Sequence, residues 1–177
     1  MNWANRLTIC RIILVPVFIT AVFYHRLNLA FIVFILATIT DGLDGYIART
    51  RKEKTKFGAI MDPIADKMLI GSAFISFSLV SGLPDHLKMP VYVPIIVVSR
   101  DVIILLWALI MYLLAGNIEV RPSIIGKVTT FCQMLTIICV LLHFVYSNWI
   151  WNIAIALTVI SGLDYIRIWS GQINGKL

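Results

Sequence analysis

Four aspartates in two closely spaced pairs are the residues of this sequence best suited to chemistry. Asp41 and Asp44 are three residues apart, and Asp62 and Asp66 are four residues apart. On an α-helix, both spacings place the members of a pair on one face. Each pair lies in or beside a long apolar segment, where an ionisable side chain is costly and is therefore a candidate for function.

The basic segment between the two pairs predicts that they meet. A short connection over residues 49–56 (RTRKEKTK) would fold the flanking helices into a hairpin and bring the four carboxylates to one depth. Such a cluster needs shared protons, arginines or metal ions, because the carboxylates repel one another. With oxygen ligands only, the metal would be Mg²⁺ or Mn²⁺. The alternative is that the acids only pair with Arg49 and Lys67.

The elements that must position these acids are long and apolar. Of the 177 residues, 60% are hydrophobic and only 14% are charged, against about 25% in an average soluble domain. The mean hydropathy is +0.92. This composition excludes an ordinary cytosolic domain, a disordered tail and a disulfide-stapled secreted module, and it indicates an integral membrane protein.

Long apolar runs predict an all-α membrane bundle of six transmembrane helices, in one domain covering residues 1–177. About 20 apolar residues are needed to cross a bilayer as a helix. The expected spans are residues 7–24, 29–48, 59–81, 91–115, 123–146 and 149–170.

The basic residues predict the orientation of this bundle. Six spans place both termini on one side, and that side would hold eleven of the fifteen cations against two, Arg26 and Lys88, on the other. The eleven are Arg6, Arg11, Arg49, Arg51, Lys52, Lys54, Lys56, Arg121, Lys127, Arg167 and Lys176. Since cytoplasmic loops carry the excess of Lys and Arg, both termini and the four aspartates should face the cytoplasm, at the inner cell membrane.

The first span begins with a polar face. Asn5, Thr8 and Arg11 follow one another at helical spacing and are too polar for contact with lipid. We expect them at the membrane interface or inside the bundle.

The segment around the aspartates resembles the signature of the CDP-alcohol phosphatidyltransferases. Residues 41–66 match the pattern D-x-x-D-G-x-x-A-R-x8-G-x3-D-x3-D at all eight fixed positions. The resemblance implies an enzyme in which an acceptor alcohol attacks the β-phosphate of a CDP-linked lipid, usually CDP-diacylglycerol, and CMP leaves. It also implies a homodimer within the membrane.

The same resemblance implies roles for individual residues. Asp41, Asp44, Asp62 and Asp66 would bind Mg²⁺ or Mn²⁺, and Asp66 would also act as the catalytic base for the acceptor hydroxyl. CDP would be bound by residues of the same signature, namely Asp44, Gly45, Ala48, Arg49 and Gly58. Arg49 suits this role because a guanidinium grips phosphate in a fork that Lys cannot match.

Several segments resemble the phosphatidylglycerophosphate synthases within that family. They are residues 55–67, 99–101, 126–127 and 161–165. The resemblance implies sn-glycerol 3-phosphate as the acceptor, and its phosphate would need cations. Arg100, Arg121 and Lys127 are the candidates, although Arg100 could instead pair with Asp101 or Asp164.

Two departures from those synthases keep other acceptors open. A second arginine is commonly found where this chain has Ala108, and a second lysine where it has Thr129. The loss of two cations suits phosphatidylglycerol, the acceptor of a cardiolipin synthase, and an inositol-type acceptor also stays possible. The alternative outside enzymes is a divalent-cation channel or carrier lined by the aspartates.

Overall fold

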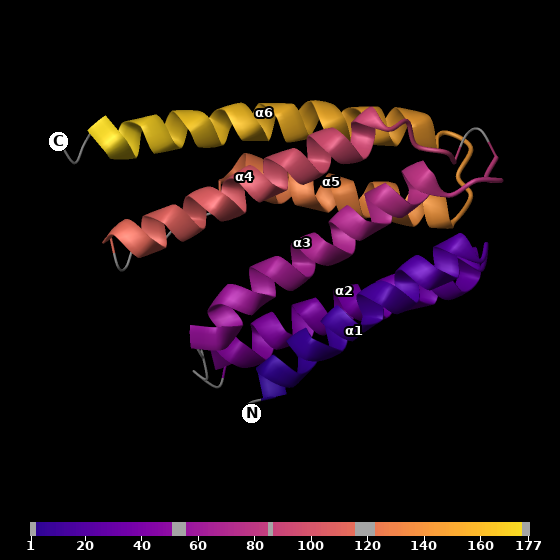
Figure 1. Ribbon diagram of the computed structural model, residues 1–177, viewed down its shortest axis with the longest axis horizontal. Helices are drawn as coiled ribbons and strands as arrows, with labels where there is room; N and C mark the ends of the chain where they lie inside the picture. The colour runs from indigo at the N-terminus through magenta and orange to yellow at the C-terminus, as the bar shows by residue number, and fades with distance from the viewer. Residues whose placement is uncertain (1–2, 51–55, 85–86, 116–122, 175–177) are drawn as a thin grey trace.

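The structure is a computed structural model that describes residues 3–50, 56–84, 87–115 and 123–174. Side chains are described over residues 7–42, 61–84, 87–110, 113 and 123–170. The described residues form six α-helices and no strand (Figure 1). The helices are α1 (Trp3–Phe23), α2 (Leu27–Thr50), α3 (Lys56–Leu79), α4 (Tyr92–Ala115), α5 (Ile124–Leu141) and α6 (Ser147–Asn174).

The six helices run alternately up and down. Figure 1 shows the start of α1, the end of α2, the start of α3 and the end of α6 at one end of the bundle. This end holds Asp41 and Asp62 and is called the acidic end below. The predicted helical hairpin that brings the two aspartate pairs to one end is therefore present.

Helix α1 packs more closely than any other described helix on the hairpin formed by α2 and α3. It contacts both α2 and α3, whereas α6 contacts α4 and α5. At the centre of the first group, the ring of Phe18 lies 5.9 Å from that of Phe34 and 6.4 Å from that of Phe77. These aromatic contacts between buried rings join α1 to α2 and α3.

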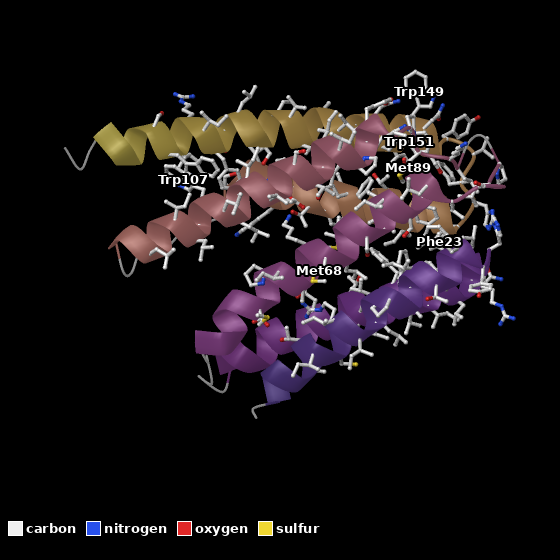
Figure 2. The ribbon with its side chains drawn as sticks, viewed as in Figure 1. Phe23, Met68, Met89, Trp107, Trp149 and Trp151 are labelled. Atoms are coloured by element: carbon white, nitrogen blue, oxygen red, sulfur yellow. The ribbon has the colours of Figure 1, made fainter. Side chains whose placement is uncertain are left out.

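A stacked aromatic pair joins α4 to α6. Trp107 lies on the side of α4 that faces α6 (Figure 2). Its ring is nearly parallel to that of Trp169, with ring centroids 4.7 Å apart. Tyr165, one turn earlier on α6, is tilted against Trp169 at 5.7 Å. The contact fixes how α6 lies along α4 near the acidic end.

The outer surface of the bundle is apolar. Large side chains such as Ile32, Leu106, Phe131 and Leu163 are exposed, and in water this surface would be unfavourable. Three helices are long and apolar enough to span a bilayer, with spans at Tyr92–Ile110, Ile124–Leu141 and Ser147–Ser170. Shorter apolar stretches cover Leu7–Phe23 and Leu27–Gly42.

The protein is therefore a helical membrane protein. The six helices coincide with the six predicted segments to within several residues, the largest differences being at helix ends. Whether every helix crosses the membrane, and on which side the termini lie, stays a prediction.

Candidate active site

Three helices contribute to a cluster of charged and polar side chains near the acidic end. Asp41 comes from α2, Asp62 and Asp66 come from α3, and Thr8 and Arg11 come from α1. The three aspartates are called the carboxylate cluster below. The i to i+3 spacing of Thr8 and Arg11 and the i to i+4 spacing of Asp62 and Asp66 place each pair on one helix face.

Arg11 joins the two sides of the hairpin. Its Nη1 lies 2.9 Å from Oδ1 of Asp41 and also donates to Oδ1 of Asp66. The side chain of Arg11 is fully buried, while the carboxylates of Asp41 and Asp66 are each 34% exposed. Charge-assisted hydrogen bonds of this kind are about twice as strong as neutral ones. Arg11 thus holds α2 and α3 together, and the carboxylates stay reachable from outside.

Thr8 completes the contact of α1 with the cluster. Its buried Oγ1 donates a hydrogen bond of 2.6 Å to Oδ1 of Asp62. The sequence predicts that the polar face of the first helix lies either at the membrane interface or inside the bundle. Thr8 and Arg11 lie inside the bundle. The side chain of Asn5, the third residue predicted for this face, lies outside the described residues.

Apolar side chains pack against the inner side of the carboxylate cluster. A cavity of 20 Å³ lies beside Arg11, Asp41 and Asp66 and is otherwise lined mainly by apolar side chains from α2, α3 and α5. The volume is about that of one water molecule. The carboxylates therefore have room for a ligand only on their exposed side.

A second polar network lies next to the cluster and crosses α3, α4 and α6. Asp101 accepts a hydrogen bond of 2.9 Å from Nζ of Lys67 and one of 2.7 Å from Nη1 of Arg100. Arg100 also donates to Oγ of Ser161 and lies over the ring of Tyr165, at 5.4 Å from the centroid. Lys67 thus pairs with Asp101, an aspartate outside the predicted set of four.

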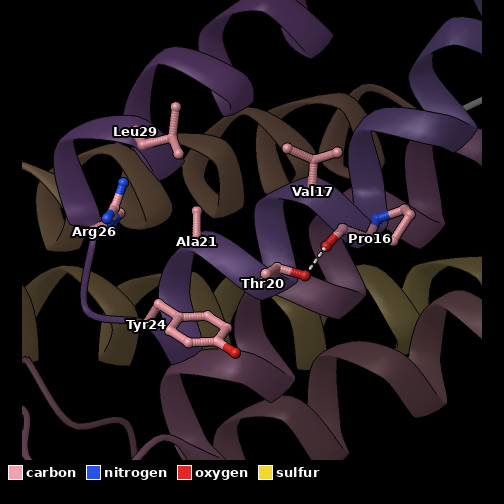
Figure 3. A pocket seen from close by; sticks show the side chains of 7 residues that line it. All are labelled: Pro16, Val17, Thr20, Ala21, Tyr24, Arg26 and Leu29. Carbon is pink, nitrogen blue, oxygen red and sulfur yellow. Dashed lines mark hydrogen bonds between the residues drawn. The ribbon is translucent and has the colours of Figure 1, made fainter.

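A larger hollow lies elsewhere and has a different character. It has a volume of 440 Å³ and lies between the ends of α1 and α2 that are remote from the acidic end (Figure 3). Pro16, Val17, Ala21 and Leu29 form most of its wall, and Thr20 turns its hydroxyl to the carbonyl of Pro16. This hollow contains no carboxylate. The carboxylate cluster is therefore the better candidate for an active site.

A sequence profile decides the family. The profile of CDP-alcohol phosphatidyltransferase matches residues 1–160 of the chain, which include the whole signature on α2 and α3. The chain belongs to the CDP-alcohol phosphatidyltransferase family.

Curated relatives agree with this assignment. A "Probable phosphatidylglycerophosphate synthase" of Mycobacterium tuberculosis is 39% identical over 93% of this chain and 80% of its own length. A "CDP-diacylglycerol--glycerol-3-phosphate 3-phosphatidyltransferase" of Rickettsia felis is 36% identical over 94% of both chains. A Bacillus subtilis protein of the same name is 30% identical over 93% of both.

The structure describes only part of the phosphatidyltransferase signature. Asp41, Asp62 and Asp66 are in place around Arg11 and Thr8. The remaining signature residues lie on α2 and α3, but their side chains are outside the described residues; these are Asp44, Gly45, Ala48, Arg49 and Gly58. Their predicted role in binding CDP stays a prediction.

The donor set of the cluster fits a hard divalent cation. Its available atoms are carboxylate oxygens, and all three aspartates are partly exposed. Mg²⁺ and Mn²⁺ prefer such ligands. Among the described residues, no three acidic, His or Cys side chains are arranged as a complete metal site. Asp44, the fourth predicted ligand, is outside that part of the structure.

The predicted acceptor-binding cations have different surroundings. Arg100 is 8% exposed and uses its guanidinium on Asp101 and Ser161, so the pairing alternative with Asp101 is realised. Lys127 is exposed in the first turn of α5, which Ser123 caps through a hydrogen bond from the Gly126 amide. Arg121 lies outside the described residues. The sequence reasoning named Asp101 as a possible partner of Arg100 but missed that Lys67 of α3 pairs with the same carboxylate.

Gly126 lets α5 approach the Arg100 network, and this predicts a loss of stability on substitution. A Cβ at Gly126 would lie 2.9 Å from Oη of Tyr165 and 3.3 Å from Nη2 of Arg100. We expect Gly126→Ala to destabilise the fold by up to about 2 kcal/mol, because overpacking outweighs the gain in helix propensity. The measurement is the apparent melting temperature in detergent at one scan rate.

Gly162→Ala is the matched control. A Cβ at Gly162 would meet its nearest atom, Cγ of Arg100, at 3.8 Å, which is ordinary contact. We expect this variant to melt at or above the wild-type temperature. Equal melting temperatures for the two variants would show that the close approach at Gly126 does not limit the packing of α5.

Proposed function

We propose that this phosphatidyltransferase transfers a phosphatidyl group from CDP-diacylglycerol to sn-glycerol 3-phosphate, forming phosphatidylglycerophosphate and releasing CMP. The observation that carries the proposal is the convergence of Asp41, Asp62 and Asp66 around Arg11, within a signature that belongs to this family. The names of the relatives from Rickettsia felis and Bacillus subtilis support the choice of acceptor.

The reaction breaks a phosphoanhydride bond and forms a phosphate ester bond. The acceptor hydroxyl oxygen attacks the β-phosphorus of CDP-diacylglycerol, the bond from that phosphorus to the bridging oxygen breaks, and CMP leaves with that oxygen. The hydroxyl proton goes to a carboxylate, for which Asp66 is our candidate. The chain's own part is to hold the two reactants together and to compensate charge, which is most of the catalysis of phosphoryl transfer.

The carboxylate cluster would hold the metal in this reaction. Asp41, Asp62 and Asp66 would bind Mg²⁺ or Mn²⁺ together with Asp44, and the metal would neutralise the diphosphate of the substrate. Arg11 and Thr8 would keep the aspartate side chains in position from α1, since each makes a direct hydrogen bond to the cluster.

We also propose that the acidic end faces the cytoplasm at the inner membrane, with both termini there and six crossings. Lys127 at the start of α5 and Arg167 near the end of α6 are exposed toward this end, whereas Arg26 and Lys88 lie toward the other. This distribution agrees with the excess of cations on cytoplasmic sides, and a water-soluble acceptor would then reach the cluster from the cytoplasm.

One observation favours phosphatidylglycerol as a second candidate acceptor. A groove of 350 Å³ lies between α4 and α6, lined largely by apolar side chains such as Ile95, Ile103 and Ile166, and it extends to Arg100. A lipid acceptor needs an opening of this kind, because its acyl chains must stay in the bilayer while its headgroup reaches the site. In that case the enzyme would be a cardiolipin synthase.

Product analysis tests the proposal. The purified protein in mixed micelles receives CDP-diacylglycerol, Mg²⁺ or Mn²⁺ and one acceptor at a time: glycerol 3-phosphate, phosphatidylglycerol or inositol phosphate. We expect phosphatidylglycerophosphate on lipid chromatography, with an equal amount of CMP, only in the first reaction. Cardiolipin from phosphatidylglycerol, with no product from glycerol 3-phosphate, would replace the first candidate with the second.

A further inference from the structure

Arg11 is a fully buried cation placed between two carboxylates that belong to the proposed metal centre. It comes from α1, outside the signature, and contacts Asp41 of α2 and Asp66 of α3 through one nitrogen. The other nearby lysine and arginine in the described part, Lys67 and Arg100, pair with Asp101. Arg11 is therefore the cation that the described structure assigns to the cluster.

A guanidinium and a divalent cation bound by the same carboxylates repel each other. Coulomb's law makes both cations attract the aspartates, and it makes the two cations repel each other. Burial strengthens the effect, since the surroundings of Arg11 screen charge less than water does. Arg11 thus stabilises the metal-free cluster and at the same time opposes metal binding.

We propose that Arg11 is a built-in competing cation that keeps the affinity of the free enzyme for metal low. The diphosphate of the lipid substrate carries negative charge into the site and offsets this repulsion, so metal and CDP-linked lipid bind cooperatively. This inference depends on the proposed metal centre. It assigns to α1 a part in controlling the site, in addition to holding Asp41 and Asp66 in place.

Direct Mn²⁺ binding in the absence of lipid substrate tests the inference. The free Mn²⁺ concentration is followed by electron paramagnetic resonance as the purified protein in detergent is titrated. We expect Arg11→Met and Arg11→Gln to bind Mn²⁺ about tenfold more tightly than the wild type, or more. Even with the screening of water, removing one positive charge about 5 Å from a divalent ion has an effect of this size. Arg11→Lys keeps the charge and should bind as the wild type does.

Two controls separate charge competition from loss of structure. Arg100→Met removes another buried arginine by the same substitution and should leave Mn²⁺ affinity unchanged, because Arg100 pairs with Asp101. Arg11→Met should also melt at a lower temperature than the wild type without metal, and Mn²⁺ should raise its melting temperature by more than it raises that of the wild type. Arg11→Gln keeps hydrogen-bond donors and serves as the neutral variant if Arg11→Met does not fold.

The outcomes distinguish the inference from the proposed function. Mn²⁺ affinity that is equal or weaker in both neutral variants would overturn the inference and would make Arg11 a residue that only positions Asp41 and Asp66, while the metal centre stands. Absence of Mn²⁺ binding by the wild type, both alone and with CDP-diacylglycerol, would overturn the metal centre and the inference together.

Discussion

Replacement of Asp66 by asparagine is expected to lower phosphatidyl transfer by about a thousandfold while CDP-diacylglycerol still binds. Asparagine has nearly the same shape and keeps an oxygen that can accept the hydrogen bond from Arg11. It removes the proton acceptor proposed for the attacking hydroxyl, and a positioned base contributes about 10²- to 10⁴-fold. Transfer is measured with labelled acceptor in detergent micelles, and binding with labelled CDP-diacylglycerol.

Asp164→Asn provides the control for this experiment. Asp164 is a partly buried aspartate of α6 outside the carboxylate cluster, and its substitution should leave transfer within a few fold of the wild type. Substantial turnover by the Asp66→Asn variant would remove the assignment of Asp66 as base. Loss of CDP-diacylglycerol binding along with transfer would instead indicate a role for Asp66 in holding the substrate.

Removal of divalent metal is expected to abolish transfer reversibly. Without metal, the carboxylates and the substrate diphosphate repel each other. The single positive charge of Arg11 does not balance the negative charge of the three described aspartates. After dialysis against a chelator, Mg²⁺ or Mn²⁺ should restore CMP release. Zn²⁺ should restore it poorly, since the cluster offers oxygen ligands without His or Cys.

The control for the chelation experiment is to show that the protein stays folded when the metal is removed. Circular dichroism and gel filtration in detergent should show the same helical content and elution before and after metal removal, because Arg11 and Thr8 hold the cluster together without metal. Transfer that continues at the full rate in excess chelator would show that the carboxylates act without a metal.

The helices and the meeting of the acids could be predicted from sequence because both depend on local patterns. Apolar length predicts a helix in a bilayer, and spacings of three and four residues predict a shared face. A short connection between two helices then leaves little choice but an antiparallel hairpin. For these reasons Asp41 and Asp62 were expected at one end of the bundle, where the structure places them.

The partners of the acids could not be predicted, because they depend on how separate helices rotate against each other. The sequence shows that Thr8 and Arg11 share a face, but not that this face meets α2 and α3. Lys67 is adjacent to Asp66 in sequence, yet successive residues on a helix point about 100° apart. Its side chain therefore reaches Asp101 on α4, at 2.9 Å.

The structure also changes the interpretation of the candidate acceptor site. From sequence, Arg100 and Lys127 were similar candidates for binding the acceptor phosphate. In the structure Arg100 is buried and ion-paired, whereas Lys127 is exposed at the start of a helix whose amides favour anions. Of the two, Lys127 is the residue whose surroundings leave it available to a soluble phosphate.

The central claim is that the carboxylate cluster on α2 and α3 is the metal-dependent centre of the enzyme. Crystals soaked with Mn²⁺ and CDP-diacylglycerol, measured near the manganese absorption edge, test it most directly. The account predicts anomalous density within about 2–2.5 Å of carboxylate oxygens of Asp41, Asp62 or Asp66, in contact with the substrate diphosphate. Anomalous density elsewhere in the protein, or substrate bound with no manganese at these aspartates, would contradict it.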